Sequence, residues 1–103
     1  MKLKKQTNKS ISTKIKELRY EITIKAEPFN NAMECSHSIE RLINKTKGLS
    51  CSGAGTYLGN PMIRDLSFTS KIGYVPLTLK KQITQIRKQY NIKLKDFTLR
   101  IQE

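Results

Sequence analysis

The stretch "LSCSGAGTYLGNPMIRDLSFTS", residues 49–70, decides the fold, because it contains two extended segments with no helix between them. Strand-like residues run from about 49 to 57 and from about 62 to 70, and "LGNP" separates the two runs. Gly59 and Asn60 can adopt positive φ, and Pro61 fixes its own φ, as tight turns require. We therefore expect two consecutive strands, joined by a short turn, in the middle of the chain.

A helix is expected on the N-terminal side of this hairpin, over residues 31–47. Apolar residues recur there at the spacing of one helix face, namely Cys35, Ile39, Leu42 and Ile43. Asn30 or Asn31 suits the N-cap position, where a side-chain oxygen accepts a backbone N–H bond. Gly48 suits the position just beyond the last turn.

A second helix is expected on the C-terminal side, over about residues 77–90, and Asn91 can end it. Its buried stripe consists of Leu79, Ile83, Ile86 and Tyr90. Its outer side carries the basic residues Lys80, Lys81, Arg87 and Lys88.

The two outermost segments alternate between apolar and polar residues, as half-buried strands do. In "LRYEITIKA", residues 18–26, one face carries Tyr20, Ile22, Ile24 and Ala26. In "DFTLRIQE", residues 96–103, we expect Phe97, Leu99 and Ile101 to point inward. The order of elements is then β-α-β-β-α-β.

Two right-handed β-α-β crossovers in that order give a four-stranded antiparallel sheet with both helices on one face. This is the ferredoxin-like arrangement of the α+β class. We expect one such domain over residues 18–103, preceded by a basic N-terminal arm, residues 1–17, that is flexible or becomes ordered on a partner.

The chain is strongly basic, with 20 Lys and Arg against 8 Asp and Glu and a net charge of +12. The charge is concentrated at the two ends: residues 1–18 carry six Lys and one Glu, and residues 71–103 carry eight basic and two acidic residues. A charge of this size is typical of a protein with a polyanionic partner. No apolar run reaches the length of a membrane span.

The expected outer face of the sheet carries no aromatic residue among Arg19, Glu21, Thr23, Lys25, Asp65, Ser67, Thr69, Thr98 and Arg100. Base stacking on the sheet is therefore not expected, and RNA would be bound through its phosphates. The predicted RNA-binding residues are Lys2, Lys4, Lys5, Lys9, Lys14, Lys16, Arg64, Lys71, Lys80, Lys81, Arg87 and Lys88.

The glycine-rich part of the hairpin does not fit a phosphate-binding loop. Such a loop needs Gly-Lys-Ser/Thr followed by a helix, and here a strand follows. Strict alternation places Gly53 and Gly55 on the same face as Cys51 and Tyr57. We interpret the glycines as sites where a helix approaches the strand closely.

Metal and catalytic chemistry have little support in the sequence. Cys35, His37 and Cys51 are the three soft ligand candidates, whereas a structural zinc site takes four ligands. A single His, with no evident Ser or Cys partner, does not predict nucleophilic catalysis. Arg64 and Asp65 are expected to form a surface ion pair. We predict no cofactor, no bound metal and no catalytic residues.

The segments "ITIKA", "TKG", "YVPLTLKKQI" and "FTLRI" occur in this order and resemble the family of small-subunit ribosomal protein S-ten. In that family a Lys-Ala or similar pair ends the first strand, Thr-Gly ends the first helix and Pro-Thr-x-Lys begins the second. The corresponding positions are Lys25-Ala26, Lys47-Gly48 and Pro76–Lys80, the last with one extra residue. The resemblance covers about residues 20–102 and implies the same fold and an rRNA-binding role.

The sequence also departs from that family. There, the second and third strands extend into a long arm that enters the ribosome, whereas this hairpin is far shorter and has no basic tip. A divergent organellar or reduced-genome member fits this pattern, and so does an unrelated ferredoxin-like protein. Ribosomal protein six shares the fold and a similar "RYE" first strand, but its aromatic-rich third strand is missing here.

The first functional interpretation is a non-catalytic RNA-binding structural protein of a ribosome or another ribonucleoprotein, with neighbouring proteins as further partners. Neither a membrane nor a small-molecule substrate is expected. The chain would be intracellular, in the cytoplasm or in a mitochondrial ribosome. A second interpretation is a small inhibitor or immunity-type protein that accepts a partner strand at the edge strand 49–57. A third is a toxin-like ribonuclease that uses Tyr57 or His37.

Overall fold

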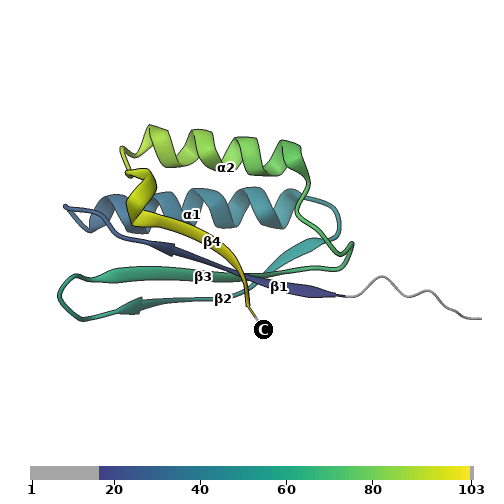
Figure 1. The fold of residues 1–103 in the computed structure, drawn as a ribbon, viewed down its shortest axis with the longest axis horizontal. Coiled ribbons are helices and arrows are strands. Elements are labelled where there is room, and N and C mark those ends of the chain that lie inside the picture. Colours follow the sequence, from purple (N-terminus) through teal and green to yellow (C-terminus); the bar gives the residue numbers. More distant parts are fainter. Residues whose placement is uncertain (1–16, 103) are drawn as a thin grey trace, which may run out of the picture.

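The computed structural model describes residues 17–102, so the six lysines of the predicted basic arm lie outside the described residues. The elements follow the order predicted from the sequence (Figure 1). They are β1 (Leu18–Ile24), α1 (Asn30–Lys45), β2 (Leu49–Tyr57), β3 (Ile63–Ser70), α2 (Leu77–Gln89), the short 3-10 helix η1 (Leu94–Asp96) and β4 (Phe97–Gln102).

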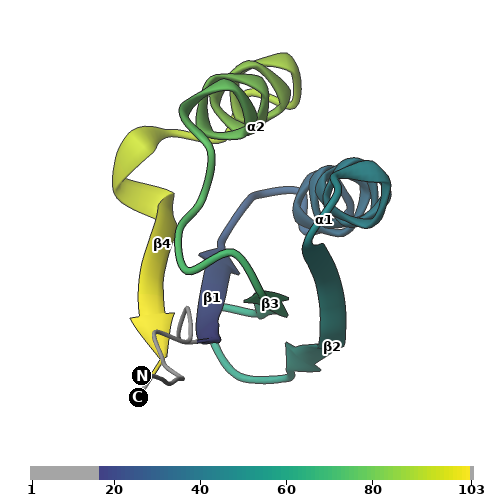
Figure 2. The ribbon, with the colours of Figure 1, turned by 90° about the vertical axis from the view of Figure 1, so that its right-hand side faces the viewer.

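The four strands form one antiparallel sheet in the order β2-β3-β1-β4. Both helices cover the same face of this sheet, α1 on the side of β2 and β3 and α2 toward β4 (Figure 2). The chain therefore has the α+β ferredoxin-like fold. The strands β2 and β4 are the edges of the sheet, which confirms the prediction that segment 49–57 is an edge strand.

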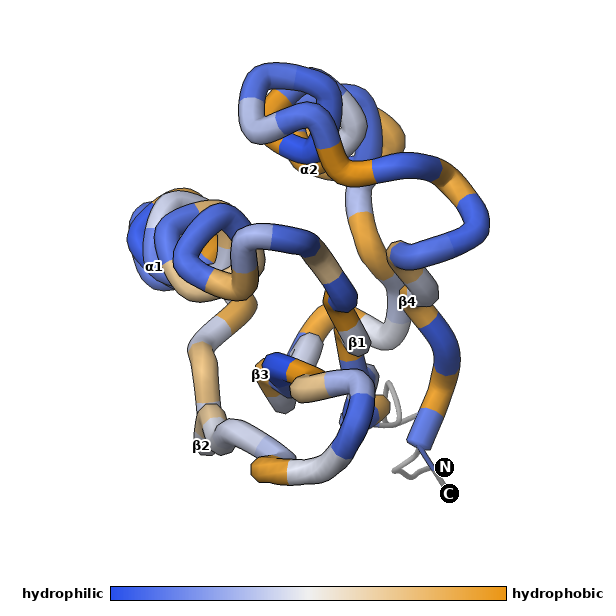
Figure 3. The backbone as a smooth tube through the Cα atoms, turned by 90° about the vertical axis from the view of Figure 1, so that its left-hand side faces the viewer, coloured by the Kyte–Doolittle hydropathy of each residue, from blue (hydrophilic) through white to orange (hydrophobic). Residues whose placement is uncertain are grey.

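The core lies between the helices and the sheet. It contains residues of the predicted stripes, namely Ile22 and Ile24 of β1, Ile39 and Ile43 of α1, and Leu79 and Ile83 of α2, together with Leu66 and Phe68 of β3. The Tyr20 and Phe68 rings stack with centroids 5.2 Å apart. The outer turns of α2 are hydrophilic (Figure 3). In the last strand, Ile101 pairs with the core residue Tyr20 and so lies on the predicted face, but it is 52% exposed on the edge strand β4.

The ends of the helices agree with the sequence for α2 and differ for α1. Asn91, with φ +59, directly follows the C-cap Tyr90 and ends α2 as expected. The helix α1 ends at Lys45 with Thr46 as its C-cap, so Gly48, with φ +86, lies further on, in the turn that leads into β2. The N-cap of α1 is Phe29, with no side-chain cap bond, and the prediction of an Asn cap was wrong. The Asn31 amide is used elsewhere: its Nδ2 donates to the Tyr90 carbonyl oxygen at 3.4 Å and ties α1 to the end of α2.

The hairpin of β2 and β3 differs from the sequence prediction in two respects, the conformation of its turn and the register of β2. Neither Gly59 nor Asn60 has positive φ, and the Asn60–Pro61 peptide bond is cis. The register of β2 against β3 also shifts between Cys51 and Gly53, where β2 carries a bulge. This extra residue moves Gly53 and Gly55 to the face opposite the helices. A Cβ on Gly53 would meet nothing within 4 Å, so the predicted close approach of a helix is wrong.

Candidate nucleic-acid interface

The outer side of α2 holds the main group of exposed lysines. Lys80 and Lys81 are adjacent, Lys88 follows them about two helical turns later, and all three are exposed. With Leu77, Thr84 and Gln85 they line a shallow groove of about 410 Å³. Long flexible ammonium side chains beside hydroxyl and amide groups suit the binding of phosphate oxygens.

The position of these lysines on the helix is unusual. The first turn of α2 contains no acidic residue, and Lys80 and Lys81 stand just after it. The N-terminus of a helix carries partial positive charge, so it favours acidic side chains and disfavours lysines. No Asp or Glu occurs in residues 66–95, whereas seven basic residues do. The surface of α2 thus lacks the local charge compensation that a merely solvated helix usually has.

Arg87 does not belong to this surface as predicted. Its side chain is half-buried, and its Nη1 donates a hydrogen bond of 2.6 Å to the carbonyl oxygen of Ile92. This bond holds the turn that follows α2 against the helix. The guanidinium also lies near the Cys35 thiol. The structure therefore gives Arg87 a packing role in place of a free phosphate-binding position.

Arg64 is also placed differently from the prediction. It points from β3 to the helix side of the sheet, where its Nε donates to the Ser36 Oγ at 3.1 Å and its Nη1 to the Thr56 Oγ1 at 3.3 Å. Asp65 is the next residue on the strand, so its side chain lies on the other face. The expected Arg64–Asp65 surface ion pair is therefore wrong, and Arg64 links β3 to α1.

Of the remaining predicted residues, Lys71 is exposed in the connection from β3 to α2, and its N–H donates to the Gly48 carbonyl oxygen at 2.8 Å. The six lysines of the arm lie outside the described residues. The residues that the structure brings together are Lys80, Lys81 and Lys88.

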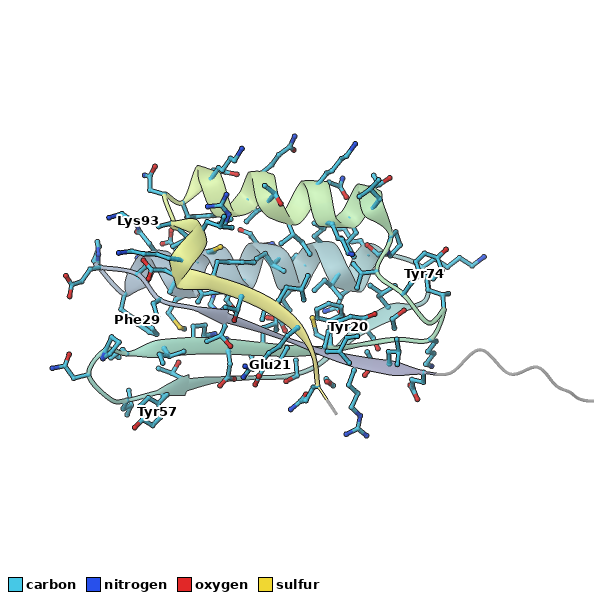
Figure 4. The ribbon with its side chains drawn as sticks, viewed as in Figure 1. Tyr20, Glu21, Phe29, Tyr57, Tyr74 and Lys93 are labelled. Atoms are coloured by element: carbon cyan, nitrogen blue, oxygen red, sulfur yellow. The ribbon has the colours of Figure 1, made fainter. Side chains whose placement is uncertain are left out.

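Sequence reasoning missed two exposed lysines that follow α2, namely Lys93 and Lys95. Lys93 lies at the end of the molecule where α2 finishes (Figure 4). These two residues and Lys25 line a separate pocket. The sequence does contain a feature that could have identified them: residues 66–95 include no Asp or Glu, and this run continues past the end of the predicted helix to Lys93 and Lys95.

The outer face of the sheet has one aromatic residue that the sequence reasoning placed on the other side. Tyr57 is 64% exposed and points away from the helices (Figure 4). The bulge in β2 causes this change, because it inverts the alternation after Cys51. Elsewhere on this face, the Arg100 Nη2 and Glu21 Oε1 form an ion pair at 3.3 Å.

The residues considered for metal or catalytic chemistry are dispersed. Among residues 17–102, no three His, Cys, Asp or Glu side chains are grouped so that they can hold a metal ion. Burial raises the pKa of the Cys35 thiol to about 11, with Arg87 opposing the shift, and raises that of the Cys51 thiol to about 11, with Glu40 adding to it. His37 is exposed on α1, whereas Tyr57 points from the opposite side of the sheet.

Within the described part of the chain, no helix combines the length and the apolar character needed to cross a membrane. Comparison with known protein families, curated proteins and solved structures finds no significant match to this chain. The resemblance to the S-ten family therefore remains a prediction from the sequence.

Proposed function

We propose that this protein is a non-catalytic RNA-binding protein that holds phosphate groups on the outer face of α2. The observation that carries the proposal is the group of Lys80, Lys81 and Lys88 on a helix with no acidic residue. Three exposed ammonium groups along one helix match the repeated charge of a nucleic-acid backbone, which a single phosphate-containing metabolite does not offer.

The helix dipole strengthens this interpretation. Lys80 and Lys81 stand near the N-terminus of α2, where their charges are locally unfavourable. Local rules are most often broken at functional sites, where a partner supplies the compensation. An RNA phosphate beside Lys80 and Lys81 would supply negative charge at the position where the helix favours it.

The S-ten resemblance supports a place in a ribosome or another ribonucleoprotein, in the cytoplasm or a mitochondrion. It also supports rRNA as the bound nucleic acid. The short β2–β3 hairpin lacks the length of the family's arm, so contacts with RNA would be made by the body of the domain. Sedimentation of the native protein with ribosomal subunits would test this assignment.

The inhibitor interpretation rests on the edge of β2, where Ser50, Ser52, Ala54 and Thr56 are exposed. The bulge between Cys51 and Gly53 interrupts the row of backbone groups that a partner strand would pair with. Natural sheets use such bulges to prevent pairing at an edge. The edge therefore supports strand addition less well than the lysine face supports RNA binding.

The proposal is tested by measuring the affinity of the full chain for single-stranded RNA as a function of salt concentration. A variant with Lys80→Gln, Lys81→Gln and Lys88→Gln removes three phosphate contacts. The slope of log K against log salt should then fall by about 2 to 3, and affinity at about 0.1 M salt should fall about a hundredfold.

The matched control carries Arg19→Gln, Lys45→Gln and Lys47→Gln, which removes the same charge from exposed positions on β1 and at the end of α1. This control should keep nearly the same salt slope as the original protein. Equal losses in both variants would mean that only net charge matters, and salt-independent binding would contradict the proposal.

A further inference from the structure

A second pocket lies at the end of the molecule where β1 leads into α1 and α2 leads into β4. It has a volume of about 590 Å³ and is separate from the lysine face of α2. Three lysines and two asparagines line it, namely Lys25, Lys93, Lys95, Asn31 and Asn91. The acidic residues of its wall are Glu27 and Asp96. Its volume lies in the range of small-ligand sites.

Backbone hydrogen bonds hold the walls of this pocket in place. The Lys25 N–H donates to the Asp96 carbonyl oxygen at 2.9 Å, and the Asp96 N–H donates to the Lys93 carbonyl oxygen at 2.9 Å. Asn91, at φ +59, turns the chain from α2 toward Lys93. The three lysines therefore start from a fixed backbone, although their ammonium groups remain free to adjust.

The potential at the pocket favours an anion through its side chains, because three lysines stand against two carboxylates. The helix dipoles add no net preference, since the N-terminus of α1 contributes Asn31 to the wall and the C-terminus of α2, which carries the opposite partial charge, ends directly before Asn91 of the same wall. The N–H groups of Asn31 and Ala32 already donate to the carbonyl oxygens of Pro28 and Phe29. The donors to a ligand would therefore be side chains.

The two carboxylates narrow the class of ligand. A bare anion gains from the lysines but is repelled by Glu27 and Asp96, whereas a ligand with hydroxyl groups can donate hydrogen bonds to those carboxylates. A ribonucleotide carries both features, because its phosphate is anionic and its ribose has two hydroxyl donors. We propose that this pocket is a ribonucleotide site, with Lys93 and Lys95 on the phosphate and Asp96 or Glu27 on the ribose.

The same chemistry can come from a free mononucleotide or from one nucleotide of a bound RNA. The site does not depend on the lysine face of α2, since Lys80, Lys81 and Lys88 do not line this pocket. The inference therefore goes beyond the proposed RNA-binding function, and it can hold whether or not α2 binds RNA.

The test is a titration of the full-length chain with adenosine 5′-monophosphate, followed through the backbone amide signals in NMR spectra. Signals of residues 25–27 and 91–96 should shift, and adenosine 5′-monophosphate should bind more tightly than inorganic phosphate. The variant Lys93→Gln with Lys95→Gln should bind it about tenfold more weakly, because two exposed charge-assisted contacts are lost. The control Lys45→Gln with Lys47→Gln should bind it as the original protein does.

An RNA arm separates the two sources. If RNA shifts the pocket signals and adenosine 5′-monophosphate competes with it, the site takes a nucleotide of the RNA; if RNA shifts only α2 signals, the site takes the free nucleotide. The Lys80→Gln, Lys81→Gln, Lys88→Gln variant should keep its affinity for adenosine 5′-monophosphate, which distinguishes this site from the α2 face. Equal affinity for inorganic phosphate, or no shift up to about 10 mM, would overturn the inference.

Discussion

Arg64 was predicted to be a surface RNA-binding residue, whereas the structure places its side chain on the helix side of the sheet. Alternation along β3 places Arg64 on the same face as Leu66 and Phe68, so the pattern already pointed it toward the helices. Counting it as a surface cation relied on its charge alone. In the structure its guanidinium bonds the fully buried Ser36 and the edge residue Thr56.

We predict that Arg64→Ala lowers the free energy of unfolding by about 1 to 3 kcal/mol, because it leaves the Ser36 hydroxyl without this partner and removes packing of the long side chain. Urea denaturation measures the change. The exposed Lys71→Ala should change stability by less than about 0.5 kcal/mol. A loss of RNA affinity in Arg64→Ala with unchanged stability would instead return Arg64 to the RNA-binding surface.

The burial of the Cys35 and Cys51 thiols predicts how alkylation and stability depend on pH. Burial raises the pKa of Cys35 and of Cys51 from 9.0 to about 11. At pH 8 the thiolate fraction is therefore about a hundredfold lower than for a free thiol, and alkylation should be slower by a similar factor. Because the folded protein holds these protons more tightly, their stabilisation is complete below pH 9 and is lost as pH rises through 11.

Urea titrations at pH 8 and pH 11 measure this effect. The original protein should lose more stability over that range than a Cys35→Ala, Cys51→Ala variant. Because each protein is compared with itself at the two pH values, any change in the free energy of unfolding that the substitutions cause at both pH values cancels. An identical pH dependence in both proteins would show that neither thiol is shielded from water.

At the scale of elements, the link from α1 to β2 depends on Gly48. Its φ of +86 disfavours any residue with a Cβ, and a Cβ there would lie 2.8 Å from the Ile72 Cγ2. Gly48→Ala should therefore destabilise the fold by about 1 to 3 kcal/mol. Gly53→Ala is the matched control, because Gly53 lacks positive φ and has open space around its Cβ position. It should be neutral or slightly stabilising. Equal losses in chemical denaturation would contradict this account.

Comparison of the observed helices and strands with the sequence shows which patterns predicted the buried residues and which did not. The apolar stripes of α1 and α2 and the alternation of β1 gave core residues correctly, because helix and strand periods persist over several residues. The pattern failed in β2, where the bulge after Cys51 reverses which residues face outward. A run of Ser, Gly and Ala has no apolar alternation to fix its register, so nothing in the sequence marks the bulge.

For the whole molecule, the acid-free run of residues 66–95 was a better guide to the candidate interface than single basic residues. It contains the α2 lysines, and it also contains Lys93 and Lys95, which the helix-based prediction omitted. The topology then separates these lysines into two groups, one along α2 and one around the pocket beside α1. That separation depends on where distant segments meet, which local sequence patterns do not specify.

A net charge of +12 lowers the stability of the folded chain through repulsion between like charges and favours binding to a polyanion. Both effects can be measured on the lysines of α2. Lys80→Gln with Lys81→Gln removes two charges that oppose the helix dipole, and Gln keeps nearly the same helix propensity. At low salt the double variant should be more stable by about 0.3 to 0.6 kcal/mol, since the dipole effect is already weakening just after the first turn, and its affinity for RNA should fall at least tenfold. Thermal unfolding and RNA titration on the same samples measure both effects.

The control is Lys88→Gln, in the last turn of α2, where a positive charge is favourable. It should weaken RNA binding without raising stability, and it should lower stability by a few tenths of a kcal/mol. The gain from Lys80→Gln with Lys81→Gln should also disappear at about 1 M salt, because screening removes the interaction with the dipole. A double variant that is less stable at low salt, or a gain that persists at high salt, would show that Lys80 and Lys81 stabilise α2 by packing. Their charges would then no longer indicate a missing anionic partner.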